Sequence, residues 1–208
     1  MKEYNKIDTV FERDMNGSKK LIKGEYRSEA VKYLAGCTWR FTEKIDGTNI
    51  RVYWDGHKIT FGGRTERATI PSHLVNKLNE IFLNNETEEL FEQKFGEKEV
   101  ILFGEGYGNK IQNGGNYRPD VGFILFDVMI GENYQTRETV EEIAKCFGLE
   151  IVPIIMEGTI EEAVYFVKQK PDSTIGKAKM EGLVGCPLVE MKDRCGKRLI
   201  VKIKACDF

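Results

Sequence analysis

The sequence contains few of the residues that would define a site or a location by themselves. It has two histidines and five prolines in 208 residues. No run reaches the roughly 18 consecutive apolar residues that a membrane-spanning helix needs. Its first residues, MKEYNKIDTVFERD, lack the apolar stretch of a secretory signal. We therefore expect a cytoplasmic protein.

Paired cysteines and a charge excess are also missing. The five cysteines are scattered and form no CxxC pair, and only His57 and His73 could complete a zinc site. We expect reduced thiols and no structural zinc. The chain carries 31 basic and 33 acidic residues, a net charge of −2. This balance argues against a chain held on nucleic acid mainly by bulk charge, although a local basic cleft is compatible with it.

What is present is the composition of a globular protein with a core. Apolar residues make up 41% of the chain, charged residues 31% and aromatic residues 11%. A chain of this length fits one domain, which we place over residues 1–208. There is no internal repeat and no proline-rich linker.

Several local patterns predict secondary structure in the first two thirds of the chain. Alternating apolar residues in NIRVYWDGHKITF predict a hairpin with a two-residue type I′ turn at Asp55-Gly56. Helical spacing in PSHLVNKLNEIFLNNETEELFEQKFG predicts two helices with a break near Asn84-Asn85. EVILFGE and VGFILFDVMI predict strands, and the glycine-rich stretch between them, which ends near Pro119, predicts a flexible surface loop that could cover a substrate cleft. This loop lacks the ending of a P-loop.

The remaining third predicts helices and a final pair of strands. Capping boxes of Thr139 with Glu142 and of Thr159 with Glu162 would open two helices, and Gly148 would end the first. GLVGCPLVEM and KRLIVKIKA predict strands. Strands that follow one another as hairpins or neighbours favour an α+β domain of antiparallel sheets flanked by helices over a doubly wound fold.

Lys44, in FTEKIDGTNI, is the candidate nucleophile. A free lysine has a pKa of about 10.4 and is protonated at pH 7. Desolvation or nearby cations can lower this pKa and so create a nucleophile. Gly47 permits a sharp turn, and Asp46 and Asn49 offer hydrogen bonds that could fix it. Asp-Gly is also ordinary turn chemistry, so a solvated lysine beside a turn is the alternative.

The segment EKIDGTN resembles the first motif of covalent nucleotidyltransferases, and most closely that of the nick-sealing branch of ATP-dependent RNA ligases. GGRTER places Arg64 twenty residues after Lys44, at the position of that branch's phosphate-contacting arginine. ILFGEG resembles the third motif, with Glu105, and FILFDV resembles the strand of the adenine-stacking aromatic, with Phe126.

The resemblance continues to the end of the chain. MEGLVG resembles the fourth motif, with Glu181, and LIVKIKA matches the fifth, a strand with Lys202 and Lys204. From about residue 38 onward, the motifs appear in the family's order. The resemblance implies an ATP-grasp-like nucleotidyltransferase (adenylation) domain, with Glu43 and Ile45 beside the nucleophile in the nucleotide site.

Residue chemistry supports these assignments but leaves alternatives open. Lys202 and Lys204 alternate, so both ammonium groups leave one face of a strand, where a triphosphate could lie between them. A lysine-protected strand edge is the alternative. Glu105 could accept hydrogen bonds from ribose hydroxyls or be a solvated strand end. Phe126 could stack on a base or belong to the core. Glu181 would bind Mg²⁺ directly or through water.

The implied reaction is RNA ligation. Lys44 would attack the α-phosphorus of ATP and keep AMP as a phosphoramidate. The AMP would pass to a 5′-phosphate, and a 3′-hydroxyl would then displace it. Arg64, Lys202, Lys204 and Mg²⁺, with Mn²⁺ as an alternative metal, would neutralise phosphate charge. Glu43 and Asn49 would orient the nucleotide and the loop. The partner would be RNA with 3′-hydroxyl and 5′-phosphate ends.

The sequence leaves competing functions open. Many ligases continue into an OB-fold or a helical domain after the fifth motif, and neither is present in these 208 residues. End capture would then depend on a missing domain or a partner protein. An ATP-dependent DNA ligase core, a capping guanylyltransferase and a non-catalytic RNA-end-binding module are the alternatives, and an unrelated α+β protein is the simplest. Thr48-Asn49 favours RNA, because DNA ligases typically carry an arginine there.

Overall fold

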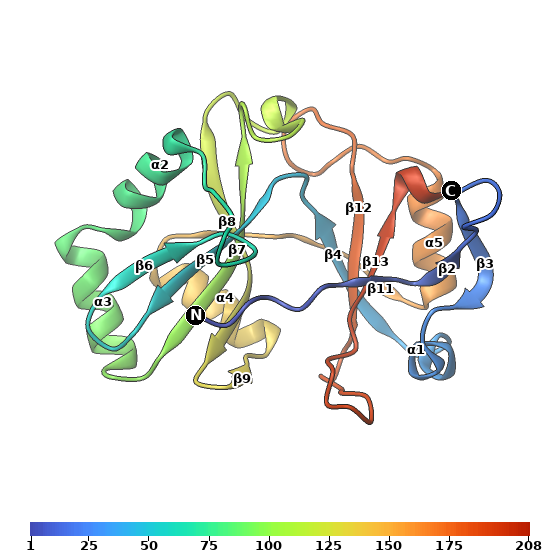
Figure 1. Cartoon of the computed structure of the whole chain (residues 1–208), viewed down its shortest axis with the longest axis horizontal. Coiled ribbons are helices and arrows are strands. Elements are labelled where there is room, and N and C mark those ends of the chain that lie inside the picture. The colour runs from blue at the N-terminus through green and yellow to red at the C-terminus, as the bar shows by residue number, and fades with distance from the viewer. The chain divides into compact units, whose positions relative to one another are not determined.

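The chain divides into two compact units whose boundaries do not follow the sequence order. The computed structural model describes residues 1–208 and is shown in Figure 1. Unit 1 comprises Met1–Asn5 and Asp46–Val152, and unit 2 comprises Lys6–Ile45 and Pro153–Phe208. The placement of one domain over residues 1–208 stays a prediction. No helix is long and apolar enough to cross a membrane.

Unit 1 is built on a six-stranded sheet with helices packed against it. The central order is β10-β8-β7-β5-β6, β9 pairs with β8, and only the β8–β10 pair is parallel. The strands are β5 (Thr48–Trp54), β6 (Ile59–Gly62), β7 (Val100–Gly108), β8 (Val121–Ile130), β9 (Asn133–Tyr134) and β10 (Glu150–Ile151). The helices are α2 (Ser72–Phe82), α3 (Asn85–Phe95), η1 (Gly114–Asn116) and α4 (Arg137–Cys146).

Alternating apolar residues of β5 pack one face of this sheet against the helices. Ile50, Val52 and Trp54 are buried in one apolar cluster with Leu74 and Leu78 of α2. The residues between them point to the other face, because successive side chains in a strand alternate. The predicted helix break is confirmed, since Asn84 accepts a hydrogen bond from Thr87 N and caps α3.

Two predictions for unit 1 are wrong: the type of the hairpin turn and the residue that caps α4. The central turn residues of the 50–61 hairpin are Gly56 and His57, and Gly56 alone of the two has a positive φ, of 98°. A type I′ turn needs two positive φ values, so this is the pattern of a type II′ turn. Thr136 caps α4 in place of Thr139, because starting three residues earlier adds a turn to the helix. Gly148, with a φ of 62°, follows the end of this helix as predicted.

The first part of the glycine-rich stretch belongs to a strand. Strand β7 continues to Gly108, which lies opposite Val121 of β8. In the loop that follows, Ile111 is 3% exposed and Tyr117 is 6% exposed. Most of its other residues are exposed, as predicted for a surface loop, and these two buried side chains anchor it in the unit.

Unit 2 is built on a five-stranded sheet in the order β1-β13-β12-β4-β11, in which only the β1–β13 pair is parallel. A two-stranded sheet of β2 and β3 lies beside it. The strands are β1 (Asp8–Thr9), β2 (Phe11–Arg13), β3 (Leu21–Tyr26), β4 (Trp39–Lys44), β11 (Ile154–Gly158), β12 (Gly182–Pro187) and β13 (Val201–Lys204). The helices are α1 (Glu29–Leu34), α5 (Ile160–Lys168) and η2 (Ala205–Asp207).

One apolar cluster holds unit 2 together. Trp39 and Phe41 of β4, Leu183 of β12 and Ile203 of β13 are all fully buried and pack with Val164 of α5. The predicted capping box of this helix is present, with Thr159 and Glu162 satisfying each other's backbone N–H groups. The mainly antiparallel sheets with helices against them confirm the α+β class.

Candidate active site

Lys44 is the last residue of β4, where the strand's alternation turns it away from the core. Trp39, Phe41 and Glu43 are buried, whereas Lys44 is half-buried. In the sheet Gly182 lies opposite Lys44 on one side and opposite Lys204 on the other. A Cβ at Gly182 would come within 2.0 Å of the Ile203 carbonyl oxygen. Glycine at this position therefore lets the two lysine-bearing strands lie against β12.

Glu181 joins the two lysines. One carboxylate oxygen lies 2.6 Å from Lys44 Nζ, and the other lies 2.8 Å from Lys204 Nζ. The hydrogen bond that Lys204 donates to Glu181 raises the pKa of Lys204. The predicted triphosphate between Lys202 and Lys204 stays a prediction, whereas the Glu181 carboxylate lies between Lys44 and Lys204. The three groups carry a net positive charge when both lysines are protonated, which suits a phosphate.

Lys202 belongs to the same strand as Lys204. Along β13, Val201 and Ile203 are buried, whereas Lys202 and Lys204 are half-buried. The two lysine side chains therefore leave the same face of the strand. The predicted shared face is confirmed. It places a third ammonium-bearing side chain on the sheet that carries Lys44.

Glu43 is buried rather than open to a ligand. Its side chain is 1% exposed, and its carboxylate accepts hydrogen bonds from Ser173 Oγ, from Thr174 Oγ1 at 2.6 Å and from Thr174 N at 3.0 Å. The residue beside the nucleophile therefore ties β4 to the segment before Glu181. Ile45 is 4% exposed, so only its backbone could face a nucleotide.

Asn49 and Glu105 form a second group of predicted residues, in unit 1. They lie directly opposite each other on β5 and β7 and share one face of the sheet. The Asn49 side-chain oxygen is buried and has no hydrogen-bond partner. Buried polar atoms are normally satisfied, so this oxygen is available to accept a hydrogen bond from water or a ligand.

Gly47 brings this pair close to the turn after the nucleophile. A Cβ at Gly47 would lie 2.4 Å from the Gly106 carbonyl oxygen and 2.7 Å from Glu105 Cγ. The loop after β7 holds the same turn, because Asp46 N donates to Tyr117 Oη at 3.3 Å and Asn113 Nδ2 donates to an Asp46 carboxylate oxygen at 3.3 Å. Asp46 and Gly47 are thus held by β7 and the loop that follows it.

A network of polar groups holds the loop that follows β7. Tyr107 Oη donates to Glu150 at 2.6 Å, and Arg118 contacts Glu150 at 3.1 Å and Asp120 at 2.7 Å. Burial and the hydrogen bond to Glu150 raise the pKa of Tyr107 to about 12. The sequence did not indicate this network.

Phe126 lies at an irregular point of β8. The register with β7 shifts there, so that Asp127 opposes Phe103 and Leu125 opposes Gly104, which leaves Phe126 as the extra residue of a β-bulge. Its ring is half-buried and meets the Tyr4 ring edge-on, with centroids 5.1 Å apart. The Tyr4 hydroxyl donates to Asp127 at 2.8 Å.

Arg64 follows β6 and is exposed, without an ion pair. The residue before it is fixed, since buried Arg51 donates to the Gly63 carbonyl oxygen at 2.7 Å. Of the predicted residues, the structure brings together Lys44, Glu181 and Lys204 in unit 2, and Asn49 with Glu105 in unit 1. Ser173, Thr174, Asn113 and Tyr117 were missed, because no local pattern ties them to the KIDG segment.

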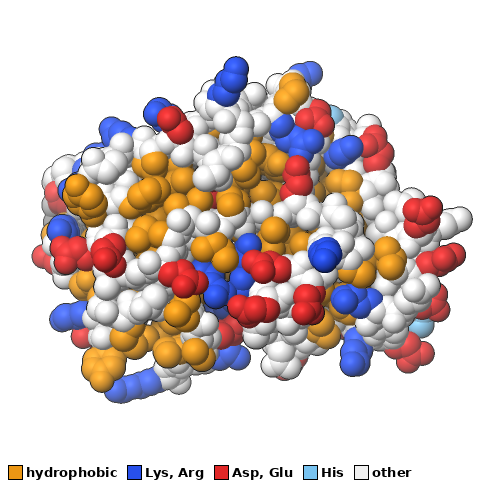
Figure 2. Space-filling view, turned by 180° about the vertical axis from the view of Figure 1, so that it is seen from behind, with side chains coloured by type: hydrophobic (Ala, Val, Ile, Leu, Met, Phe, Trp, Pro, Cys, Tyr) orange, Lys and Arg blue, Asp and Glu red, His pale blue; other side chains and the backbone are white.

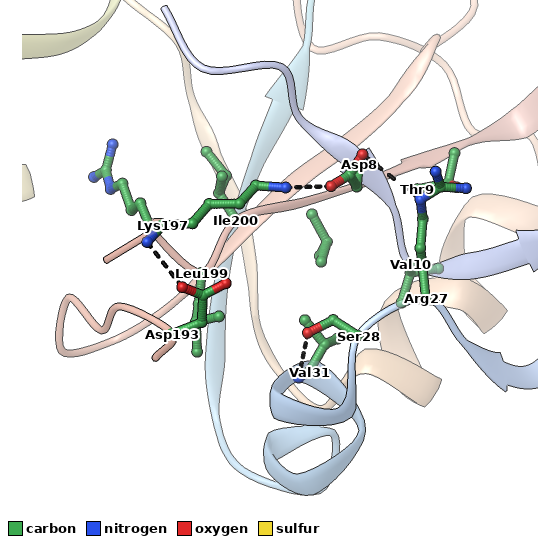
Figure 3. A pocket seen from close by; sticks show the side chains of 12 residues that line it. Asp8, Thr9, Val10, Arg27, Ser28, Val31, Asp193, Lys197, Leu199 and Ile200 are labelled. Atoms are coloured by element: carbon green, nitrogen blue, oxygen red, sulfur yellow. Dashed lines mark hydrogen bonds and ion pairs between the residues drawn. The ribbon is translucent and has the colours of Figure 1, made fainter. Parts of the chain in front are cut away.

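One cavity of unit 2 lies away from these residues. It measures about 260 Å³ and is lined by residues of β1, of α1 and its approach, and of the chain before β13 (Figure 3). None of the predicted site residues lines it. The five cysteines are unpaired, and no cluster of three or more histidine, cysteine, aspartate or glutamate side chains could hold a metal ion.

The chain is similar to known proteins both in its sequence family and in its fold. A family model described as RNA ligase matches residues 38–204. No curated protein sequence matches the chain significantly. The fold is similar to solved structures of RNA ligase from Naegleria gruberi. A variant solved with ATP and Mn shares 19% identity at a TM-score of 0.63, and the match covers 86% of this chain and 54% of that one.

Two further Naegleria gruberi structures agree. An apo variant shares 20% identity at a TM-score of 0.65, with 85% of this chain and 52% of that chain covered. The enzyme with PPi shares 20% identity at a TM-score of 0.63, with 98% and 62% covered. The chain thus spans about half to three fifths of the length of these proteins.

The α+β fold agrees with the nucleotidyltransferase fold that the motifs predicted. Because the family match extends over most of the chain, the protein belongs to the RNA ligase family.

Proposed function

We propose that the protein is an ATP-dependent RNA ligase that joins a 3′-hydroxyl to a 5′-phosphate through AMP bound covalently to Lys44. The observation that carries the proposal is the placement of Lys44 Nζ at a strand end, beside Glu181 and within the same ion-pair group as Lys204. Membership of the RNA ligase family supports RNA as the substrate.

In the first step Lys44 Nζ, as the neutral amine, attacks the α-phosphorus of ATP. An N–P bond forms, the bond from that phosphorus to the pyrophosphate oxygen breaks, and the lysine proton is lost to solvent or a nearby base. Lys202, Lys204 and Arg64 neutralise the charge that accumulates on the leaving pyrophosphate.

In the second step an oxygen of the RNA 5′-phosphate attacks the phosphorus of AMP and frees Lys44. In the third, the 3′-hydroxyl attacks the RNA 5′-phosphorus, and AMP leaves. Glu105 and Asn49 would hydrogen-bond the nucleotide, and Phe126 would line the base. The unpaired Asn49 oxygen fits a polar ligand group.

A divalent metal also fits the donor set. Mg²⁺ commonly takes one or two protein carboxylates together with substrate phosphates, and Glu181 offers such a carboxylate once it parts from the lysines. The metal, Mg²⁺ or Mn²⁺, would neutralise phosphate charge. Relatives solved with ATP and Mn support this pairing. A cytoplasmic location, and a further domain or partner protein that captures ends, stay predictions.

The test is incubation with α-labelled ATP and Mg²⁺, followed by denaturing electrophoresis. We expect a label on the wild type that pyrophosphate removes, and no label on Lys44→Ala or Lys44→Arg. Lys23→Ala, which changes an exposed lysine of unit 2 paired with Glu161, is the matched control and should label normally. Labelling of Lys44→Ala would exclude Lys44 as the nucleophile.

Strand sealing then separates RNA from DNA ligation. Nicked duplexes that differ only in a ribose or a deoxyribose at the 3′-hydroxyl end should be sealed with a preference for ribose. Equal sealing of both would favour a DNA ligase core. A protein that neither labels nor seals pre-adenylated RNA would be an end-binding module.

A further inference from the structure

The connector between β12 and β13, residues 188–200, stands apart from the sheet that it joins. Its only ladder contact is an isolated bridge between Lys192 and Arg198, and Figure 1 shows it as the loop that extends below β12. Leu188, Val189 and Met191 are 44%, 69% and 38% exposed. Three exposed apolar side chains within four residues are more than the scattered ones that a surface normally shows.

The base of this connector is fixed although its tip is open. Lys197 pairs with Asp8 of β1, which also lies 3.6 Å from Arg27, and Leu199 and Ile200 are buried (Figure 3). Arg198 Nη2 lies 3.2 Å from Glu190 within the connector. Because the base is already held in place, a contact made by the tip costs little additional conformational entropy.

The connector is basic in an acidic chain. It holds four lysine and arginine residues against two acidic ones, a net charge of +2, whereas the whole chain carries −2, so the remaining residues carry −4. Acidic and basic side chains intermingle over the face seen in Figure 2. Within the connector, Lys192 and Arg194 are exposed and their side chains form no ion pair or hydrogen bond. They are free to neutralise an external anion.

The position of the connector relative to the nucleophile follows from strand geometry. Gly182, at the start of β12, lies opposite Lys44, and Pro187, at its end, leads into the connector. Five rises of roughly 3.3 Å separate the first and last of these six residues by about 17 Å. At roughly 3.4 Å per nucleotide along a duplex strand, this equals about five nucleotides.

We propose that the connector binds the sugar–phosphate backbone of duplex RNA about five nucleotides from the break that Lys44 serves. This rests on the proposed function. Lys192 and Arg194 contact phosphates, and the exposed apolar side chains lie against the sugar edges. A duplex suits a contact at fixed distance because it is stiff over far more than about five base pairs, whereas a single strand is not.

The test measures binding of a labelled nicked RNA duplex, without ATP, as a function of salt. The double variant Lys192→Ala/Arg194→Ala should bind on the order of tenfold more weakly at about 0.1 M salt, and its log–log salt slope should fall by about 2. The control is Lys98→Ala/Lys145→Ala, which removes two exposed, unpaired lysines of unit 1 and so the same charge. Its slope should stay close to that of the wild type.

Substrate length supplies the second readout. Shortening the duplex to about four base pairs on each side of the nick should remove the difference between the connector variant and the wild type, and arms of about twelve should restore it. An equal loss in the control variant would assign the effect to bulk charge and overturn the proposal. So would an equal loss on single-stranded RNA, or no binding of any duplex by the wild type.

Self-adenylation separates this proposal from the proposed function. The connector variant should retain the label from ATP, since the connector lies away from Lys44. A wild type that takes no label would refute the proposed function whatever the binding result. A change of oligomeric state on Val189→Asp, with RNA affinity unchanged, would assign the connector to a protein partner and overturn the RNA proposal.

Discussion

The Lys44 ammonium lies 2.6 Å from a Glu181 carboxylate oxygen. In the proposed reaction Lys44 attacks phosphorus only as the neutral amine, so this ion pair would have to open before the first step. Phosphate oxygens or a metal ion would then offer each of the two charged groups another partner.

Glu181→Gln tests this exchange. The amide keeps the shape but removes the charge that would engage a metal ion, and we expect self-adenylation to fall on the order of 100-fold. Rates at several Mg²⁺ concentrations would check it. Glu157→Gln, which breaks the more exposed pair with Arg40, is the control and should leave the rate within about twofold. An unchanged rate for Glu181→Gln would remove this carboxylate from the reaction.

The buried Glu43 carboxylate predicts a stability effect. Thr174→Val removes the hydroxyl that donates to it and leaves a buried charged acceptor with one donor fewer, which should cost about 1–3 kcal/mol of unfolding free energy. Denaturant unfolding would measure it. In Glu43→Gln the same Thr174 change should cost less, so a double-mutant cycle would show coupling. Additive effects would contradict the role assigned to this contact.

Gly47 predicts a steric effect. In Gly47→Ala the new methyl group would meet the Gly106 carbonyl oxygen at 2.4 Å, so β5 and β7 must move apart. We expect a loss of about 1–3 kcal/mol in unfolding free energy, together with a large loss of self-adenylation. Gly36→Ala, where nothing lies within 4 Å of the added Cβ, should be close to neutral in both measurements.

The Tyr107 network predicts a pH dependence. The pKa of Tyr107 is raised from 10.0 to about 12 by burial and by the hydrogen bond to Glu150. A raised folded-state pKa gives stability that is fully present below about pH 10 and is lost as the pH rises toward 12. Phenolate absorbance during alkaline titration should show one tyrosine fewer at high pH in Tyr107→Phe. Glu150→Gln should shift that titration to lower pH.

Much of the fold could be predicted because its signals are local. The alternation of β5 and β13 fixed which residues face the core, and the Asn84 break and the Thr159 cap are contained in a few consecutive residues. The turn at Gly56 and the start of α4 were missed for the opposite reason. In each, two neighbouring arrangements have nearly the same local signal, and the difference depends on how the flanking element packs.

The site was predicted in part for the same reason. Lys44, Lys202 and Lys204 are recognisable in short motifs, but their partners come from distant parts of the chain. Ser173 lies 130 positions from the Glu43 that it contacts, and Tyr117 lies 71 positions from Asp46. The bulge at Phe126 depends on the register of β7 against β8, which the sequence of either strand alone does not specify.

The two units also set an order for assembly during synthesis. Strand β4, which ends in Lys44, pairs only with β11 and β12, so about 110 residues separate Lys44 from Ile154 of its earlier neighbour. At about 5–20 residues per second, β4 waits roughly 5–20 s on the ribosome without either partner strand. Almost all of unit 1 is made in that interval and can fold first. The strand that ends in Lys44 is therefore among the first to emerge and among the last to be completed.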